Sequence, residues 1–260
     1  MLEAQGITLC RGVRLVLEAS SLALATGELV ALCGPNGAGK SSLFALLAGE
    51  IGPGTGSVTL GGRPLAGFSA AALAVERAAL EQAPSLSAPF TVAELVALGL
   101  SAVPRAEIDE PALCARAMQA AGVAGLAGRG ADRLSGGERA RAHLARVLAQ
   151  LWAGRAAGGG RYLMLDEPTA SLDIAHQLAV MRAARGEAEG GAGVLVVLHD
   201  LNLAAAFADR VVLMHAGRIA AEGGPADVFE AARLSAVYET PLAVEWTARG
   251  LRIMPDLWGR

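Results

Sequence analysis

The chain has 260 residues and a formal net charge of −3, with a sequence pI near 5.9. This acidic balance gives no sign of a polyanion-binding surface, so nucleic acid is not an expected partner. Hydrophobic residues make up 53% of the chain. The longest uncharged apolar stretches, such as residues 95–104, are nevertheless shorter than the ~18 residues that a bilayer span needs. With no basic run before Glu3, we expect no secretory signal and a cytosolic chain.

Three cysteines lie far apart with no CxxC pair, which predicts small buried hydrophobic residues in a reducing compartment. The four histidines show no HxxxH or HxH spacing, so no zinc site is expected. Lys40 is the only lysine among 22 basic residues. A chain that otherwise uses arginine has lysine at this one position, which indicates that a compact point charge is needed there.

In chain order, short β-type runs occur at residues 7–9, 15–17 and 28–33, and the last run enters a glycine-rich loop. Residues 40–48 have helical spacing, and residues 57–60 form a strand before a tight Gly-Gly turn. An alanine-rich helical pattern with four prolines runs from about 82 to 131. Strand signals return at 162–165 and 194–198, each before a helix-like segment, and glycine-rich residues 153–160 predict a surface loop. The alternation predicts an α/β fold with a mostly parallel sheet covered on both faces.

A phosphate-binding loop is predicted at residues 34–41, which read GPNGAGKS between a strand and a helix. Its glycines let successive backbone N–H groups face one point, and the following helix adds its positive N-terminal end. Lys40 should reach the β- and γ-phosphates of a nucleotide, and the Ser41 hydroxyl should bind Mg²⁺. The predicted ATP-binding residues are Gly34, Pro35, Asn36, Gly37, Ala38, Gly39, Lys40, Ser41 and Ser42.

Two carboxylates end a hydrophobic strand in residues 161–168, RYLMLDEP. Asp166 fits the carboxylate on the Mg²⁺ side of a P-loop nucleotidase. Glu167 is then placed to orient or deprotonate the attacking water. The alternative is an acidic helix N-cap with Pro168 at the first helical position.

Residues 134–138 read LSGGE, directly before an arginine-bearing amphipathic helix. Ser135, Gly136 and Gly137 offer backbone donors at a helix N-terminus, which predicts a second phosphate site. The alternative is a capping box between Ser135 and Glu138, three residues further on. The whole motif comprises Leu134, Ser135, Gly136, Gly137 and Glu138.

GPNGAGKS, LSGGE, LMLDEP and the later VLHD resemble the Walker A, signature, Walker B and switch-histidine motifs of ABC ATPases, in that family's order. The resemblance covers residue 2 to about 245. It implies the ABC ATPase fold, with a mostly parallel sheet core, an antiparallel β subdomain and an α-helical subdomain. It places the core and β subdomain at residues 1–81 and 153–260, and the helical subdomain at about 82–152.

The same resemblance implies a homodimer, in which Ser135 and its glycines face the γ-phosphate bound by a second copy of the chain. By this resemblance Gln82 contacts Mg²⁺ and senses a permease, and Asp173 belongs to the D-loop. His199 becomes the γ-phosphate switch residue; by its sequence alone it would be a surface histidine at a strand end. Mg²⁺, as the partner of ATP, would be held by Ser41, Gln82 and Asp166.

Two positions depart from the family pattern. Many ABC ATPases stack adenine on an aromatic residue near the first turn, where this chain has Arg11. An arginine plane offers another stacking surface. Ser42 replaces the usual threonine after the Walker A serine and keeps a hydroxyl.

Residues 88–99 and 199–223 resemble the importers of heme, ferric siderophores and cobalamin. Trp152, followed by the glycine-rich residues 153–160, more narrowly resembles the hemin-import ATPases. The resemblance implies a peripheral subunit on the cytoplasmic face of the bacterial inner membrane. Its partners would be a transmembrane permease dimer and, indirectly, a periplasmic solute-binding protein. Ferric siderophore or cobalamin remains the alternative cargo. A soluble, non-transport ABC ATPase is a further alternative, although this chain has neither long coiled coils nor a second ATPase unit.

Overall fold

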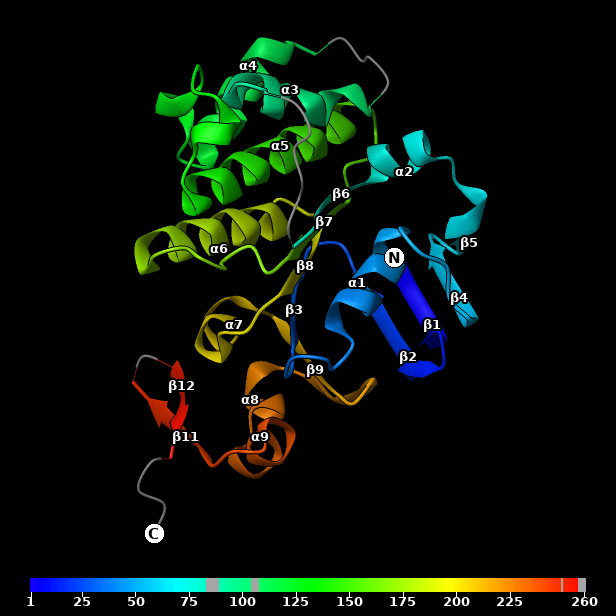
Figure 1. Cartoon of the computed structure of the whole chain (residues 1–260). Helices are drawn as coiled ribbons and strands as arrows, with labels where there is room; N and C mark the ends of the chain where they lie inside the picture. The colour runs from blue at the N-terminus through cyan, green and yellow to red at the C-terminus, as the bar shows by residue number, and fades with distance from the viewer. Residues whose placement is uncertain (83–88, 104–107, 249, 257–260) are drawn as a thin grey trace. The chain divides into compact units, whose positions relative to one another are not determined.

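The computed structural model describes residues 1–82, 89–103, 108–248 and 250–256. The chain divides into two compact units (Figure 1). Unit 1 comprises Met1–Leu65 and Leu195–Arg260, and unit 2 comprises Ala66–Val194. Strand β8 (Gly193–Val197) crosses the boundary and is therefore described with both units. The subdomain division expected from the sequence, with its helical part at about 82–152, stays a prediction.

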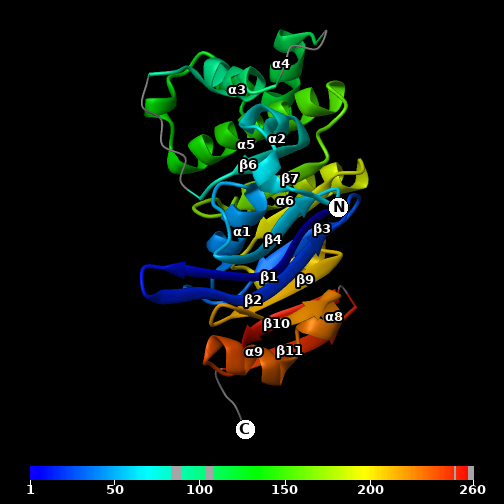
Figure 2. The same ribbon diagram turned by 90° about the vertical axis from the view of Figure 1, so that its right-hand side faces the viewer.

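In its described residues, unit 1 contains two larger sheets and a two-stranded hairpin. The first is antiparallel, in the order β2-β1-β4-β5 (Figure 2). In the second, the order is β10-β9-β3-β8; β3 runs parallel to β9, and β10 is antiparallel to β9. The strands are β1 (Leu2–Arg11), β2 (Arg14–Leu24), β3 (Leu29–Cys33), β4 (Thr55–Leu60), β5 (Arg63–Pro64), β9 (Arg210–His215) and β10 (Arg218–Gly223). All five residues of β3 are buried, so this strand forms the centre of the unit's core.

The described part of unit 1 also includes four helices and a C-terminal hairpin. The helices are α1 (Lys40–Ala48), α7 (Leu201–Phe207), α8 (Pro225–Val228) and α9 (Ala231–Tyr238). Strands β11 (Leu242–Thr247) and β12 (Gly250–Pro255) form the hairpin. The Asn202 side chain fixes this hairpin to α7, because it donates to the Ile253 carbonyl and accepts from the Ile253 amide at 3.0 and 2.8 Å.

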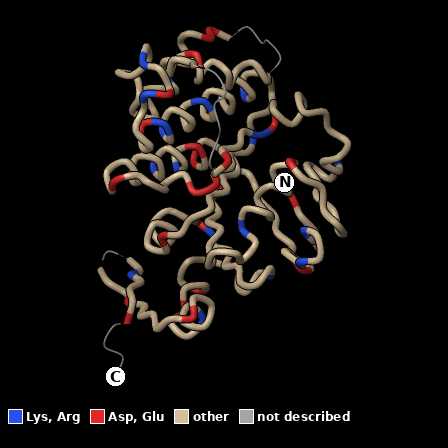
Figure 3. Tube along the Cα trace, viewed as in Figure 1, with Lys and Arg blue, Asp and Glu red and all other residues tan. Residues whose placement is uncertain are grey.

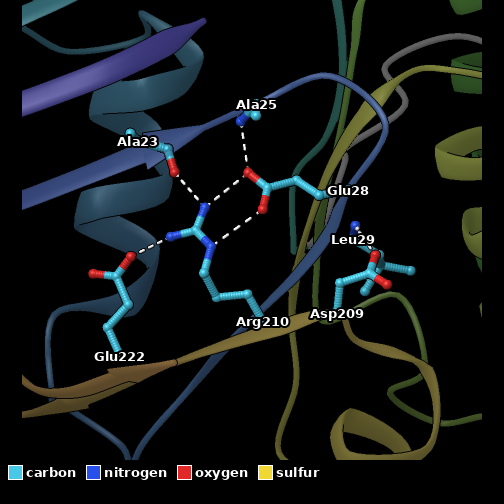
Figure 4. Close-up of polar contacts among 7 residues, drawn as sticks. All are labelled: Ala23, Ala25, Glu28, Leu29, Asp209, Arg210 and Glu222. Atoms are coloured by element: carbon cyan, nitrogen blue, oxygen red, sulfur yellow. Dashed lines mark hydrogen bonds and ion pairs between the residues drawn. The ribbon is translucent and has the colours of Figure 1, made fainter. Parts of the chain in front are cut away.

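Arg210, at the start of β9, ties several segments of unit 1 together (Figure 4). Its guanidinium donates to both carboxylate oxygens of Glu28, at 2.8 and 3.1 Å, and to the Ala23 carbonyl at 2.6 Å. It also pairs with Glu222 on β10. The neighbouring Asp209 accepts from the Leu29 amide at 2.8 Å. Because a planar guanidinium can satisfy several acceptors at once, one side chain aligns β2, β3, β9 and β10.

Unit 2 combines strands β8, β7 and β6, in that order, with a group of helices. Strands β6 (Arg77–Leu80) and β7 (Tyr162–Asp166) are parallel. The helices are α2 (Ala70–Glu76), α3 (Val92–Ser101), α4 (Glu110–Ala120), α5 (Gly136–Ala156) and α6 (Ile174–Glu189), with short 3₁₀ turns at Ala124–Leu126 and Ala131–Arg133. A further 3₁₀ turn, Leu65–Gly67, leads in from unit 1. Helix α5 contacts α2, α3 and α4. Acidic and basic positions are interspersed along these helices (Figure 3).

The strands predicted at 57–60, 162–165 and 194–198 and the helix at 40–48 are present, within one or two residues at their ends. Together with the antiparallel sheet and the helices of unit 2, they confirm the predicted α/β fold class. Among the helices in the described ranges, none combines the length and apolar character needed to span a bilayer.

The surface loop predicted at residues 153–160 is confirmed only for its second half, where residues 157–160 leave the helix and Ala157 and Gly158 are exposed. Helix α5 continues to Ala156, and Gly154 and Gly160 are buried. A Cβ atom on Gly154 would lie 2.3 Å from the Val75 carbonyl oxygen, and one on Gly160 would lie 2.4 Å from that of Leu151. Gly154 therefore allows α2 to approach α5 closely, and Gly160 allows the chain to fold back against the end of α5. The composition of the segment gives no sign of either contact.

The cysteine prediction is correct for Cys33 and Cys114, which are buried, and wrong for Cys10, which is exposed. The reason is strand alternation. Leu9 of β1 faces the core, so Cys10, the next residue, faces solvent.

Substituting Gly160 tests the close packing at the end of α5. Gly160 and Gly158 both have positive φ, at 65° and 86°, but only Gly160 is crowded; nothing lies within 4 Å of a Cβ on Gly158. We expect Gly158→Ala to cost about 1–2 kcal/mol from its backbone conformation alone. Gly160→Ala should cost roughly 1–3 kcal/mol more because of overpacking. Urea denaturation of both variants measures the difference, and equal losses would contradict the packing role.

His143, in the middle of α5, is 2% exposed. Both of its ring nitrogens are buried, and neither has a hydrogen-bond partner among the described residues. The pKa of His143 is lowered to about 4, chiefly by burial and in addition by the positive charges of Arg146 and Arg139. The imidazole is therefore neutral in the folded chain at physiological pH.

This buried histidine should make stability depend on pH. The folded-state pKa of about 4 lies below the ordinary value of 6.5. The unfolded chain therefore binds a proton that the folded chain does not, and the free energy of unfolding should fall as pH drops from 6.5 toward 4. In His143→Leu this slope should be shallower, as measured by chemical denaturation at a series of pH values. Parallel profiles for the two proteins would rule out the assigned cause.

Candidate functional site

The predicted phosphate-binding loop connects β3 to α1 in unit 1. Gly34 has φ 142°, and a Cβ there would lie 2.2 Å from the Met214 carbonyl oxygen of β9, so only glycine fits. Helix α1 has Gly39 as its N-cap, with no side-chain cap and no acidic residue in its first turn. Its N-terminal amides are therefore not capped by a side chain, and the helix end is suited to bind an anion.

Lys40 begins α1 and is 5% exposed. Its Nζ donates to the carbonyl oxygens of Gly34 and Pro35 at 2.7 and 3.0 Å. The ammonium thus lies inside the curl of the loop, where it would meet phosphate oxygens. Burial raises the pKa of the neighbouring Cys33 thiol to about 12, so this residue stays neutral beneath the loop.

His199 lies at the same sheet edge of unit 1 as this loop. The Leu198 amide donates to the Leu32 carbonyl at 3.1 Å, so the segment after β8 begins beside the end of β3. Asp200 caps α7 by accepting from the Asn202 and Leu203 amides. His199 is exposed between the buried strand and this cap. The structure therefore brings together two of the predicted elements, the loop and the histidine.

In unit 2, β7 ends in Asp166, which is 5% exposed, and Glu167 follows with φ 50°. Gln82 Nε2 donates to Glu167 Oε2 at 2.8 Å. The alternative of a helix capped by these carboxylates, with Pro168 at its first position, is not adopted, because α6 starts only at Ile174. A pocket of about 240 Å³ is lined by Gln82, Asp166 and Glu167 together with Gly136 of the LSGGE segment.

The LSGGE segment forms the capping box that its local chemistry predicts. Ser135 Oγ accepts from the Glu138 amide at 3.2 Å, and Glu138 accepts from the Ser135 amide at 2.8 Å. The hydrogen bond from the Ser135 backbone lowers the pKa of the Glu138 carboxyl. Leu134 is buried, whereas Ser135 and Gly136 are exposed at the start of the 21-residue helix α5. The cap therefore leaves the surface of Ser135 and Gly136 open to another molecule.

Asp173 is the N-cap of α6. Its Oδ1 contacts the backbone amide and Nδ1 of His176 at 2.9 and 2.8 Å, and the backbone hydrogen bond lowers the pKa of the Asp173 carboxyl. A Cβ on Gly137 would lie 3.1 Å from Leu172 Cδ2, so the segment before α6 packs against the LSGGE segment.

Arg14 was not singled out from the sequence. Arg11 and Arg14 face each other across the β1–β2 turn. Arg14 Nη2 lies 3.9 Å from the position that a Cβ on Gly37 would occupy, so its guanidinium reaches the phosphate-binding loop. The two arginines of the hairpin were the available signal, but only the folded position of Arg14 near Gly37 shows which one approaches the loop.

The expected ligands for Mg²⁺ are oxygen donors: the Ser41 hydroxyl, the Gln82 amide and the Asp166 carboxylate. Hard oxygen ligands of this kind suit Mg²⁺, which usually takes few protein ligands and completes its shell with phosphates and water. Within the described ranges there is no cluster of three or more His, Cys, Asp or Glu residues that would form an all-protein metal cage. The donor chemistry therefore fits a nucleotide-bound Mg²⁺.

Comparison with known proteins identifies relatives over nearly the whole chain. The ABC transporter family model matches residues 17–170. The hemin import ATP-binding protein HmuV of Rhodopseudomonas palustris strain HaA2 is 44% identical over 257 residues, which cover 98% of this chain and 97% of the relative. HmuV of Streptomyces coelicolor is 50% identical over 244 residues, covering 93% and 84%.

Solved structures agree on the fold. An inward-facing conformation of a putative metal-chelate type ABC transporter matches with a TM-score of 0.77 at 22% identity, over 98% of this chain and 96% of that chain. The dimeric structure of MJ0796, a bacterial ABC transporter cassette, matches with a TM-score of 0.76 at 24% identity, over 86% and 99%. The chain therefore belongs to the ABC transporter family and is one of its ATPase subunits.

Proposed function

We propose that this chain hydrolyses ATP to drive heme (hemin) import through a partner permease. The observation that carries the proposal is the 44% identity, over almost the full length of both chains, to a protein named for hemin import. The phosphate-binding loop, the carboxylates that end β7 and the exposed Ser135 support the ATPase part of the proposal independently of that name.

In the proposed reaction, residues 34–42 bind the ATP phosphates through Lys40 and through their backbone N–H groups, except at Pro35, and Ser41, Gln82 and Asp166 would hold Mg²⁺. The metal would neutralise charge on the β- and γ-phosphates. Glu167 accepts a proton from the attacking water, whose oxygen bonds to the γ-phosphorus as the bond to ADP breaks. His199 contacts the γ-phosphate. Since Lys40 Nζ already binds the loop carbonyls, the phosphates meet a charge that is held in place before they arrive.

The proposed assembly is a homodimer in which Ser135 and Gly136 of each copy face the γ-phosphate held by the other. Their exposure in the free chain supports this role, as does the long helix behind them, whose N-terminal end favours an anion. Asp173 would lie at the same interface, because its segment packs beside Gly137.

The wider partners follow from the import function. A transmembrane permease dimer would bind this chain at the cytoplasmic face of the bacterial inner membrane. A periplasmic solute-binding protein would deliver the cargo. Ferric siderophore and cobalamin remain alternative cargoes for the same machine. A non-transport ATPase is less well supported, because the relatives described above are named for import.

Glu167→Gln should bind ATP but hydrolyse it at least ~100-fold more slowly, because the amide cannot accept the proton of water. Phosphate release measures hydrolysis, and a fluorescent ATP analogue measures binding. Glu189→Gln is the matched control, since Glu189 is exposed and pairs with Arg185 on its own helix. Near-normal hydrolysis by the Glu167 variant would remove this residue from the mechanism.

Cargo is tested by reconstituting the chain with its genomic-neighbour permease in lipid vesicles. Binding protein loaded with heme, a ferric siderophore or cobalamin is added in turn, and vanadate-sensitive ATPase activity is recorded. Heme should stimulate turnover, because the loaded permease is coupled to the ATPase dimer. The Glu167→Gln chain in the same vesicles should show no stimulation. Stimulation by another cargo, with heme inert, would overturn the heme proposal and leave the ATPase proposal intact.

A further inference from the structure

Ile174 is an apolar side chain in a polar setting. It is the first residue of α6 and is 75% exposed, beside the exposed Asp173 and Ala175. The cap on α6 explains why Asp173 stands there, but it gives no reason for a large apolar neighbour in water. Single exposed apolar residues are common, so Ile174 becomes informative only with a matching surface elsewhere.

Unit 1 has a suitable pocket. It measures about 310 Å³ and lies between the phosphate-binding loop, the β9–β10 turn and the end of α9. Ala38 and Val237 in its lining are buried, and Pro35 and Tyr238 also line it. His215 lines it too, and the Nδ1 atom of this histidine is buried without a hydrogen-bond partner among the described residues. We call this the α9 pocket.

The α9 pocket and Ile174 are linked through the proposed dimer, on which this inference rests. Within unit 2, Gly137 lies against Leu172, two residues before Ile174. If Gly137 of one copy closes over the phosphate-binding loop of the other, residues 172–174 arrive at the same loop. Pro35 and Ala38 of that loop are part of the α9 pocket.

We propose that Ile174 of one copy docks into the α9 pocket of the second copy, with Asp173 facing His215. Pro35, Ala38 and Val237 of the α9 pocket offer apolar surface to the Ile174 side chain, and His215 offers an imidazole to the neighbouring carboxylate. Asn36 and Glu239 also line the pocket. In a two-fold dimer this contact occurs twice. Helix α9, which carries none of the sequence motifs, therefore helps to close the nucleotide-bound dimer.

Ile174→Asp in the Glu167→Gln chain provides the first test. An acidic residue in the first turn of a helix is favourable, so the variant should fold and bind ATP normally. Losing two buried isoleucines per dimer should raise the dimer dissociation constant with Mg-ATP roughly 100-fold, about tenfold for each. Sedimentation velocity measures it. Leu98→Asp is the control, since Leu98, on α3 of unit 2, is also a large, exposed apolar residue.

A disulfide provides the second test without a change of charge. Ile174→Cys and Ala216→Cys, in a chain with Cys10→Ser, should form an intermolecular disulfide that depends on Mg-ATP, because Ala216 is an exposed part of the pocket. An ATP-dependent dimer that Ile174→Asp leaves unchanged, or that forms no disulfide, would overturn the docking. The docking would also be overturned if Leu98→Asp weakened the ATP-dependent dimer as much as Ile174→Asp does. If the parent chain forms no ATP-dependent dimer, the proposed homodimer itself is wrong.

Discussion

The buried ammonium of Lys40 is the constraint on which the nucleotide site depends. A charge that is 5% exposed costs several kcal/mol unless it is solvated by the protein, and here carbonyl oxygens of the loop surround it. That requirement makes the loop curl tightly, and the curl brings Gly34 against β9 at a distance that excludes any Cβ. Arg210 fixes β9 beside β3 through Glu28, so an ion pair in the sheet supports the geometry of the loop.

In unit 2 the corresponding constraint is the backbone of Glu167. A glutamate with positive φ costs of order 1–3 kcal/mol, and such strain persists where surrounding contacts enforce it. One enforcing contact is the hydrogen bond from Gln82. In the proposed reaction the same amide holds Mg²⁺. One Gln82 side chain would thus serve two partners, and a movement of this residue would change the surroundings of Glu167 as well as those of the proposed metal site.

Local patterns predicted what local physics determines. A strand, a glycine loop and a helix in succession, or a serine three residues before a glutamate, have one favoured geometry, and the structure has both. The errors involve tertiary contacts. Residues 153–160 are predicted to be a surface loop, because the sequence at Gly154 and Gly160 gives no sign of the Val75 and Leu151 backbones that these glycines approach. The α9 pocket joins residues about 200 positions apart, so no window of sequence could reveal it.

The packing at the end of α5 involves the segment that most resembles hemin-import ATPases. Trp152 donates to Glu187 at 2.8 Å beneath the Arg116 guanidinium, and the following glycines pack against α2. Every one of these contacts is internal to unit 2. The segment that most resembles hemin-import ATPases is thus explained by packing, and none of its contacts requires heme. Its link to heme runs through similarity to relatives named for hemin import, whereas the proposed ATPase mechanism is argued from the chemistry of Lys40 and Glu167 themselves.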